Sequence, residues 1–156
     1  MPQIIEITEA GNDYAATSFR WELFILAGLP SDPSTYFAGY DKSKVSPIGA
    51  PDNVMFDSAG NLWIATDGAA SAIKYADGLF AVPVQGAERG NLQQFFSTVT
   101  GSEVCGPEFT PDERTLFLAI QHPGEGGTFE EPISTWPDRA GLPRPSVITI
   151  QAYDSR

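Results

Sequence analysis

The stretch EVCGPEFTPDERTLFLAIQHPGE, residues 103–125, indicates the fold of this chain more clearly than any other. It contains a short β-rich run, an acidic turn, a strong apolar strand and a Gln-His-Pro-Gly-Glu exit. A second stretch, PDNVMFDSAGNLWIATDG, has the same order of features over residues 51–68. The two stretches lie about fifty residues apart, which is the spacing of successive blades in a β-propeller.

Each stretch is predicted to form an antiparallel hairpin. In the first, residues 53–56 lead through Asp57-Ser-Ala-Gly-Asn into the apolar run 62–66. In the second, residues 108–110 lead through Pro-Asp-Glu-Arg into the run 115–121. Propeller blades begin with such a short inner strand and a stronger second strand, and the ends of the inner strands face a central channel.

The rest of the chain supports an all-β fold, because glycines and prolines separate short β-rich runs. These predicted strands cover residues 3–8, 19–27, 53–56, 62–66, 72–75, 79–84, 92–97, 108–110, 115–121 and 146–152. They suffice for about two blades and a fraction, whereas a closed propeller needs about four to eight. We therefore expect residues 1–156 to be a partial propeller that belongs to a larger domain or self-associates through its open blade edges.

Residues 124–145 fall outside this pattern, because their glycines and prolines exclude a regular strand or helix. Loops of this length are often functional. We expect an ordered loop over one end of the blades, with Trp136 as its apolar anchor.

Composition excludes some function classes. The net charge of −11 and the lack of a basic cluster argue against nucleic acid as a partner. No apolar run is long enough to span a bilayer, and the acidic N-terminus does not read as a signal peptide. Cys105 is the only cysteine, so an intrachain disulfide is impossible, and burial as a small side chain is its expected role.

Several polar residues stand where blade strands end at the predicted channel. Asp52 and Asn53 precede an inner strand, Asp67 follows an apolar strand, and Glu103 precedes the next inner strand. Turn chemistry is the alternative for the aspartates, above all for Asp57 and Asp112 in the hairpins, but glutamate is a poor turn residue. With one histidine in the chain, oxygen ligands would dominate any metal site, which favours calcium.

His122 follows the apolar strand of the second stretch and precedes Pro123. It is either a hydrogen-bonded structural histidine or a contact for phosphate or metal at the channel mouth.

The chain resembles the PhoX-type alkaline phosphatases. The resemblance rests on Phe-Arg-Trp-Glu-Leu-Phe-Ile-Leu-Ala-Gly at residues 19–28, on the two hairpin stretches, and on Ser-Thr-Trp-Pro-Asp and Pro-Arg-Pro-Ser-Val near the end. It covers nearly all of this chain but only the C-terminal part of a family member. It implies a six-bladed propeller, phosphomonoesterase activity, calcium and iron at one end of the channel, and export to the periplasm or the cell exterior.

Carried over by the resemblance, Asp52 and Glu103 are metal ligands or their immediate support, with Asn53 and Asp67 as weaker candidates. The chain departs from the family pattern where Cys105 replaces the usual Thr, where Asn53 stands at a common Gly position, and where Glu113 stands at a hairpin position that usually carries Gly.

The leading hypothesis is therefore the C-terminal blades of a metal-dependent phosphatase that acts on small phosphate esters, with only part of the site in this chain. Two alternatives remain open: a calcium-dependent propeller lactonase or related hydrolase, and a binding module without enzyme activity.

Overall fold

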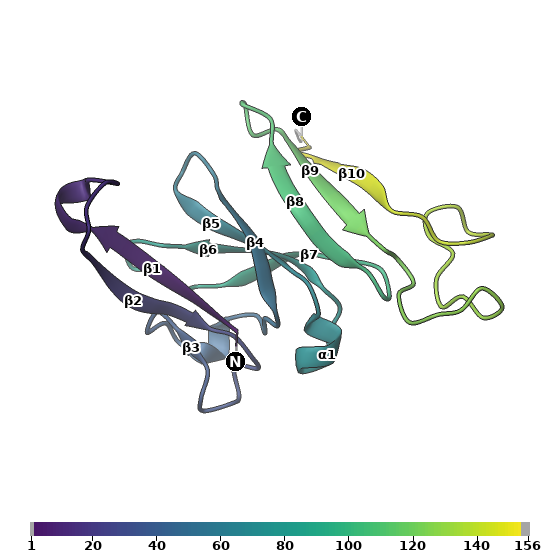
Figure 1. Ribbon diagram of the computed structural model, residues 1–156, viewed down its shortest axis with the longest axis horizontal. Helices are drawn as coiled ribbons and strands as arrows, with labels where there is room; N and C mark the ends of the chain where they lie inside the picture. Colours follow the sequence, from purple (N-terminus) through teal and green to yellow (C-terminus); the bar gives the residue numbers. More distant parts are fainter. Residues whose placement is uncertain (1, 154–156) are drawn as a thin grey trace.

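Three antiparallel sheets lie side by side in the computed structural model, which describes residues 2–153 (Figure 1). The first sheet has the order β1(Gln3–Glu9), β2(Phe19–Leu26) and β3(Tyr36–Phe37). The second has the order β4(Pro51–Phe56), β5(Asn61–Thr66), β6(Gly78–Pro83) and β7(Gln93–Ser97). The third has the order β10(Ser146–Gln151), β9(Thr115–Gln121) and β8(Glu103–Phe109). The predicted all-β class is confirmed.

The two hairpins that define the repeat are closed by the turn chemistry expected of aspartate. In the first hairpin, the Asp57 carboxylate accepts hydrogen bonds from the backbone N–H of Asn61 at 2.8 Å and from the indole of Trp63 at 2.9 Å. In the second, the Asp112 carboxylate accepts from the hydroxyl of Thr110 at 2.6 Å and from the backbone N–H of Arg114. Local bonds of this kind account for both aspartates without a ligand.

The two hairpin tips also touch each other. Glu113 has a positive φ of 53°, a conformation in which a residue other than glycine is strained. Its carboxylate accepts hydrogen bonds from the backbone N–H and, at 2.8 Å, from the hydroxyl of Ser58. The residue that replaces the expected glycine therefore ties the second hairpin to the first.

The prediction of a strand at residues 72–75 is wrong. The helix α1(Ala69–Ile73) lies there, between β5 and β6. The buried carboxylate of Asp77 accepts hydrogen bonds from the backbone N–H of Gly68 at 3.0 Å and of Ala69 at 2.9 Å, which fixes the start of the helix. Lys74 then ends it in a left-handed conformation. Two short 3₁₀ turns, η1(Ala10–Asn12) and η2(Lys42–Lys44), complete the list of helical segments in the described chain.

The core consists of two apolar clusters. The first joins the first two sheets and includes Phe24, Ile48, Ile64 and Val82. The second includes Ala65, Leu79, Val104 and Leu118, which come from the second and third sheets. The central sheet thus contributes buried side chains to both clusters, one with each neighbour.

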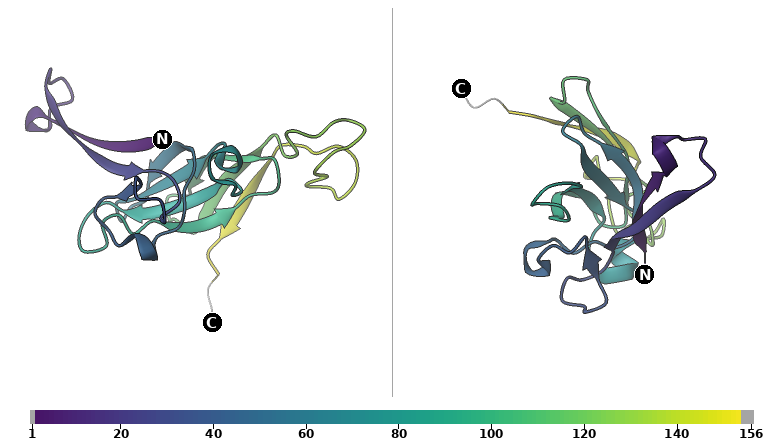
Figure 2. Two further views of the ribbon diagram at one scale, coloured as in Figure 1. Left: turned by 90° about the horizontal axis from the view of Figure 1, so that it is seen from below. Right: turned by 90° about the vertical axis from the view of Figure 1, so that its left-hand side faces the viewer.

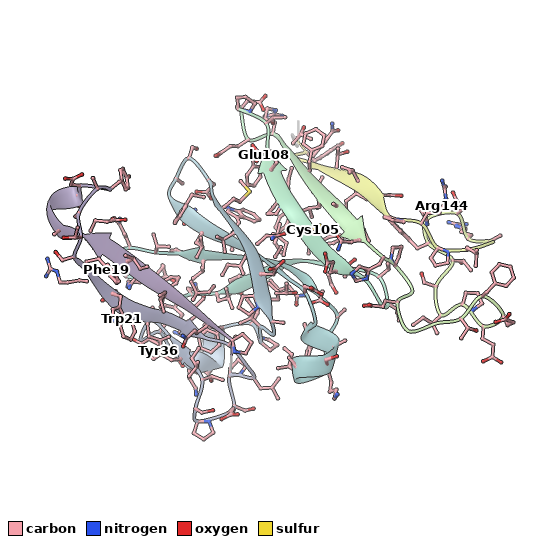
Figure 3. The ribbon with its side chains drawn as sticks, viewed as in Figure 1. Phe19, Trp21, Tyr36, Cys105, Glu108 and Arg144 are labelled. Carbon is pink, nitrogen blue, oxygen red and sulfur yellow. The ribbon has the colours of Figure 1, made fainter. Side chains whose placement is uncertain are left out.

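The β1–β2 hairpin exposes an apolar surface on the side away from the central sheet. Ile7 pairs with Trp21 across the two strands, and both are exposed, as are Ile5 and Phe19 (Figure 3). Seen from the side, this hairpin projects beyond the body of the protein (Figure 2). On the third sheet, Val147 of β10 is similarly exposed.

The segment between β9 and β10 is a long irregular loop, as predicted, and it projects at the end opposite to the β1–β2 hairpin (Figure 1). Trp136 packs against the second apolar cluster, so its predicted role as an anchor is confirmed. Within residues 2–153, the helices are all too short or too polar to span a membrane.

Candidate metal centre

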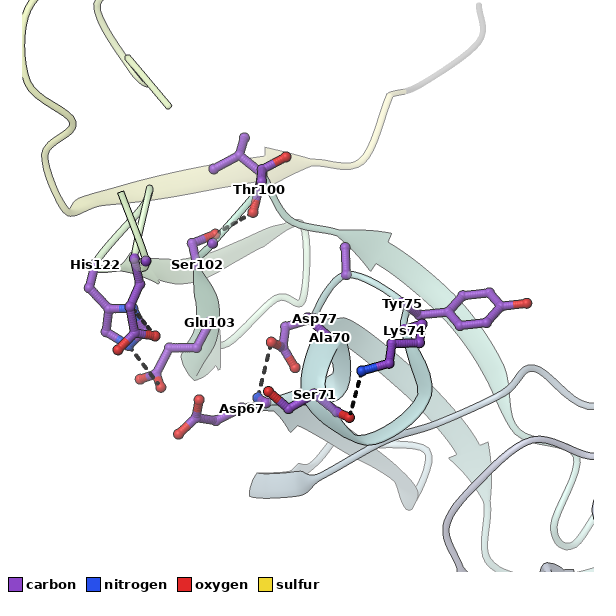
Figure 4. A pocket seen from close by; sticks show the side chains of 16 residues that line it. Asp67, Ala70, Ser71, Lys74, Tyr75, Asp77, Thr100, Ser102, Glu103 and His122 are labelled. Carbon is purple, nitrogen blue, oxygen red and sulfur yellow. Dashed lines mark hydrogen bonds and ion pairs between the residues drawn. The ribbon is translucent and has the colours of Figure 1, made fainter. Parts of the chain in front are cut away.

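Asp67, Glu103 and His122 meet at one end of the second and third sheets (Figure 4). Asp67 directly follows β5, Glu103 is the first residue of β8, and His122 directly follows β9. One ligand atom of each residue lies within 4.8 Å of the others. Three side chains that lie far apart in the sequence therefore offer two carboxylates and one imidazole to a common point.

The strand register explains why these residues meet. Glu103 pairs with Gln121 at the ends of β8 and β9, so His122 emerges beside Glu103. Both hairpins end their second strands on this side, and Asp67 leaves β5 at the position that matches Gln121 in the repeat. The sequence pattern predicts that this inner strand covers residues 108–110. In the structure, β8 already begins at Glu103.

Glu103 is the buried member of the group, since only 7% of its side chain is exposed. Burial raises the pKa of its carboxyl, and the neighbouring carboxylate of Asp67 raises it further. The His122 imidazole opposes this shift, with its Nε2 3.3 Å from Glu103 Oε2. A cation between the two carboxylates would relieve their repulsion, which is a common reason for such an arrangement.

Asp67 is held in place by a neighbour that the sequence did not reveal as important. Asp77 Oδ1 accepts a hydrogen bond from the Thr66 hydroxyl at 2.7 Å, and the Thr66 hydroxyl accepts one from the backbone N–H of Gly78 at 3.0 Å. Because Asp77 also binds the backbone at Gly68 and Ala69, it fixes the chain on both sides of Asp67. In the sequence, Asp77 stands within Ala-Asp-Gly at residues 76–78 and directly precedes β6.

His122 is half-buried and has a positive φ of 32°. Its Nδ1 lies 3.5 Å from Glu125 Oε2, yet this buried nitrogen makes no hydrogen bond within the described residues. Buried polar atoms are seldom left without a partner, and the charged neighbour of this nitrogen is the Glu125 carboxylate. Glu125 is a further residue of the site that sequence analysis did not single out.

The turn that carries His122 is fixed by the loop between β7 and β8. The backbone N–H of Gly124 donates to the carbonyl of Thr100 at 3.1 Å, and that of Glu125 donates to the carbonyl of Gly101 at 2.8 Å. A Cβ at Gly101 would lie 2.7 Å from the carbonyl oxygen of Glu125, so only glycine allows this close approach.

Asp52 and Asn53 do not join the three-residue group. Both lie in an irregularity of the β4–β5 pairing, between Pro51 and Val54. Asn53 Oδ1 accepts a hydrogen bond from the backbone N–H of Gly106 at 3.2 Å, which links β4 to β8. Their assignment as metal ligands stays a prediction, and the observed contact of Asn53 is structural.

Cys105 lies two residues after Glu103 and is partly exposed. Its thiol donates a hydrogen bond to Gln121 Oε1 at 3.4 Å. Burial raises the pKa of this thiol, and the charges of Glu103, Asp52 and Asp67 add to the effect. Asp52 is therefore near enough to affect this end of β8 electrostatically.

The group borders a cavity of about 570 Å³. Its walls come from the α1 region, the loop between β7 and β8, and the turn after β9 (Figure 4). Four lining residues carry carboxylates: Asp67, Asp77, Glu103 and Glu125. The donor set of carboxylates and one imidazole suits calcium through its oxygens and iron through both donor types. Three side chains are fewer than the ligands calcium takes, so water or other groups would complete its coordination.

Comparison with known proteins relates this chain to a class of phosphatases. The sequence model of the family described as alkaline phosphatase PhoX matches residues 1–124. A solved structure of Pseudomonas fluorescens PhoX, in complex with vanadate as a transition-state analogue, has 36% sequence identity and a TM-score of 0.75. The match covers 96% of this chain and 26% of the Pseudomonas chain. No curated protein matches.

The chain thus belongs to the PhoX family of alkaline phosphatases. It spans about a quarter of the length of the matched structure. The resemblance found in the sequence is confirmed.

Proposed function

We propose that this chain supplies part of the active centre of a metal-dependent phosphatase that hydrolyses phosphate monoesters. The observation that carries the proposal is the convergence of Asp67, Glu103 and His122 at the border of one cavity. The vanadate in the matched structure, an analogue of the phosphoryl-transfer transition state, supports a phosphate ester as substrate.

In this proposal Asp67 and Glu103 hold calcium, with iron as a second metal at the same end of the sheets. Bound cations supply charge neutralisation for the phosphate oxygens and activation of an oxygen nucleophile. Glu103 is buried, so its carboxylate would face a bound cation with little competing solvent. Asn53 supports the site through its hydrogen bond to β8, and Asp52 is kept as a candidate ligand or support.

His122 is proposed to contact phosphate. Its imidazole lies between the carboxylates of Glu103 and Glu125, which fix the ring in place. Because Nδ1 is buried and lies 3.5 Å from Glu125 Oε2, contact between Nδ1 and phosphate in this proposal requires the Glu125 side chain to move.

We further propose that the three sheets are blades of a six-bladed propeller. The exposed apolar faces of the first and third sheets support this view, because the central sheet is covered on both sides by neighbours of the same kind. More sheets, from further polypeptide or from a second copy of this chain, would cover them. Sedimentation velocity at several protein concentrations tests self-association directly.

A periplasmic or extracellular location is proposed by analogy with the family alone, and cell fractionation with a specific antibody tests it.

Calcium binding followed by isothermal titration calorimetry tests the centre. We expect E103Q to weaken calcium binding by about 10-fold or more, because loss of groups that merely orient metal ligands already costs 10- to 100-fold. Glu108 is exposed on the same strand, so E108Q is the matched control and should bind calcium normally. Equal affinity in E103Q and E108Q would rule out this centre.

The reaction is tested by assaying a phosphate monoester and a lactone side by side, before and after treatment with a chelator. Hydrolysis of the phosphate ester that is lost on chelation and restored by calcium is expected. Turnover of the lactone instead would replace the phosphatase with the lactonase alternative. Metal analysis of the purified protein tests for iron.

A further inference from the structure

Among the described residues that line the cavity, Lys74 is the only lysine or arginine. The other charged side chains on its walls are the four carboxylates, together with His122. Lys74 itself is exposed to solvent. Within the described residues, no ion pair involves Lys74.

The backbone of Lys74 has a strained conformation, and its side chain makes one long contact. The residue ends α1 with φ 66° and ψ 28°, a left-handed conformation that is unfavourable for any residue but glycine. Its ammonium lies 3.5 Å from the carbonyl oxygen of Ser71, beyond the distance of a good hydrogen bond. Figure 4 shows the amine turned back beside Ser71.

A lysine at the end of a helix can bind the last free carbonyl groups, and this is the simplest role for Lys74. The long distance to Ser71 speaks against that role as a sufficient explanation. Glycine, which is common after a helix, would end α1 here without strain. The cavity wall therefore carries a positive charge whose one contact within the described residues is this long one to Ser71.

A phosphate group bound in the cavity would offer a negatively charged partner to the Lys74 ammonium. A phosphate monoester carries up to two negative charges, and cations at Asp67 and Glu103 would face only some of its oxygens. The remaining oxygens would lie near acidic walls that include Glu125. Lysine is a common point-charge ligand of phosphate, and an ammonium on a long stem can reach the oxygens turned away from the metal.

We infer that Lys74 is an anion-binding residue of this cavity and contacts the phosphate group of the substrate on the side turned away from the metal centre. This inference rests on the proposed phosphatase function. It assigns to the α1 wall a role in substrate affinity, separate from the metal ligands on β5, β8 and β9.

The experiment measures the binding of inorganic phosphate to the calcium-loaded protein by calorimetry. We expect K74M to weaken phosphate binding by about 10-fold or more, since a charge-assisted contact is lost. K74R keeps the charge and should remain within about threefold of the wild type. K44M is the matched control, because Lys44 is exposed outside the cavity and pairs with Asp41 at 3.9 Å.

Calcium affinity measured without phosphate should be the same in K74M and the wild type, which separates substrate binding from damage to the metal centre. Phosphate binding that is equal in the wild type and K74M would overturn the role of Lys74 and leave the phosphatase proposal intact. Calcium-loaded wild-type protein that binds no phosphate would overturn both.

Discussion

The two hairpin repeats share their strands and turns but differ in how the chain leaves them. After β5, Asp67 leads into a short helix whose start is fixed by Asp77. After β9, His122 leads through Pro123 into a turn that is fixed by the backbone of Thr100 and Gly101. The shared part builds the sheets, whereas the two different exits supply the side chains of the candidate centre. The proposed function therefore depends on the segments in which the two repeats differ.

The role of the segment that follows β5 is tested by replacing Asp77. In D77A, the hydrogen bonds from Thr66, Gly68 and Ala69 to a buried carboxylate are lost. We expect the free energy of unfolding in urea to fall by about 3 kcal/mol, because hydrogen bonds to charged groups are each worth roughly 1.5–3 kcal/mol. Calcium affinity should fall as well, since Asp67 loses its support.

The matched control for this variant is D112A in the turn of the second hairpin. Its carboxylate is exposed and bonds only locally, so a loss of about 0.5–1 kcal/mol is expected. Equal losses in D77A and D112A would contradict the special role of the first exit.

The role of the turn that follows β9 is tested by replacing Gly101. In G101A, the new Cβ would approach the backbone oxygen of Glu125 to 2.7 Å, and the positive φ of 65° adds strain. We expect a loss of about 2–3 kcal/mol in urea unfolding from overpacking and strain together. The His122 turn should move, which nuclear magnetic resonance of the His122 ring would detect.

Gly60 provides the control, because it has a φ of 83° but a Cβ added there would have no other atom within 4 Å. G60A should therefore cost only the backbone strain, about 1–2 kcal/mol. The His122 resonances should stay unchanged in G60A, and a shift there as large as in G101A would argue against the contact with Glu125.

The link between the hairpin tips should have a smaller effect. E113A removes the bonds to Ser58 but keeps the strained backbone, so we expect a loss of about 1 kcal/mol. E113G removes the same bonds but also relieves the strain, which should bring its stability within about 0.5 kcal/mol of the wild type. Identical urea midpoints for the two variants would show that the strain at Glu113 has no energetic weight.

The smallest effect concerns pH. The pKa of Glu103 is raised above its ordinary 4.5, first by burial and then by Asp67, so the folded state binds this proton more tightly than the unfolded state. Without metal, the protonated Glu103 carboxyl therefore stabilises the folded state. This contribution to the free energy of unfolding is lost as pH rises through the pKa that Glu103 has in the folded protein. E103Q cannot titrate there, so its stability relative to the wild type should increase from pH 4 to pH 7. A constant difference across that range would contradict the shift.

The sequence predicted the parts of this molecule that repeat. Both hairpins, the turn roles of Asp57 and Asp112 and the anchoring by Trp136 follow from local patterns and are observed. The helix α1 was missed because its apolar residues resemble a strand, and the contact from Asp77 that favours a helix comes from beyond it.

The candidate centre was predictable only in part. Asp67, Glu103 and His122 were each singled out by their places at strand ends. Their convergence depends on the β8–β9 register and on the packing of the second sheet against the third, which short sequence patterns do not encode. Glu125 and Lys74 were missed, because each lies in a segment whose course is set by tertiary contacts.

The single thiol of the chain, that of Cys105, lies beside the candidate centre, so its reactivity can be used to follow cation binding. The carboxylates of Glu103, Asp52 and Asp67 disfavour the thiolate of Cys105, and burial does so more strongly. A bound cation would offset the carboxylate charges and make the sulfur a faster nucleophile. The rate at which iodoacetamide alkylates the protein should therefore rise with calcium occupancy. If the bound ion only shielded the thiol sterically, the rate would fall.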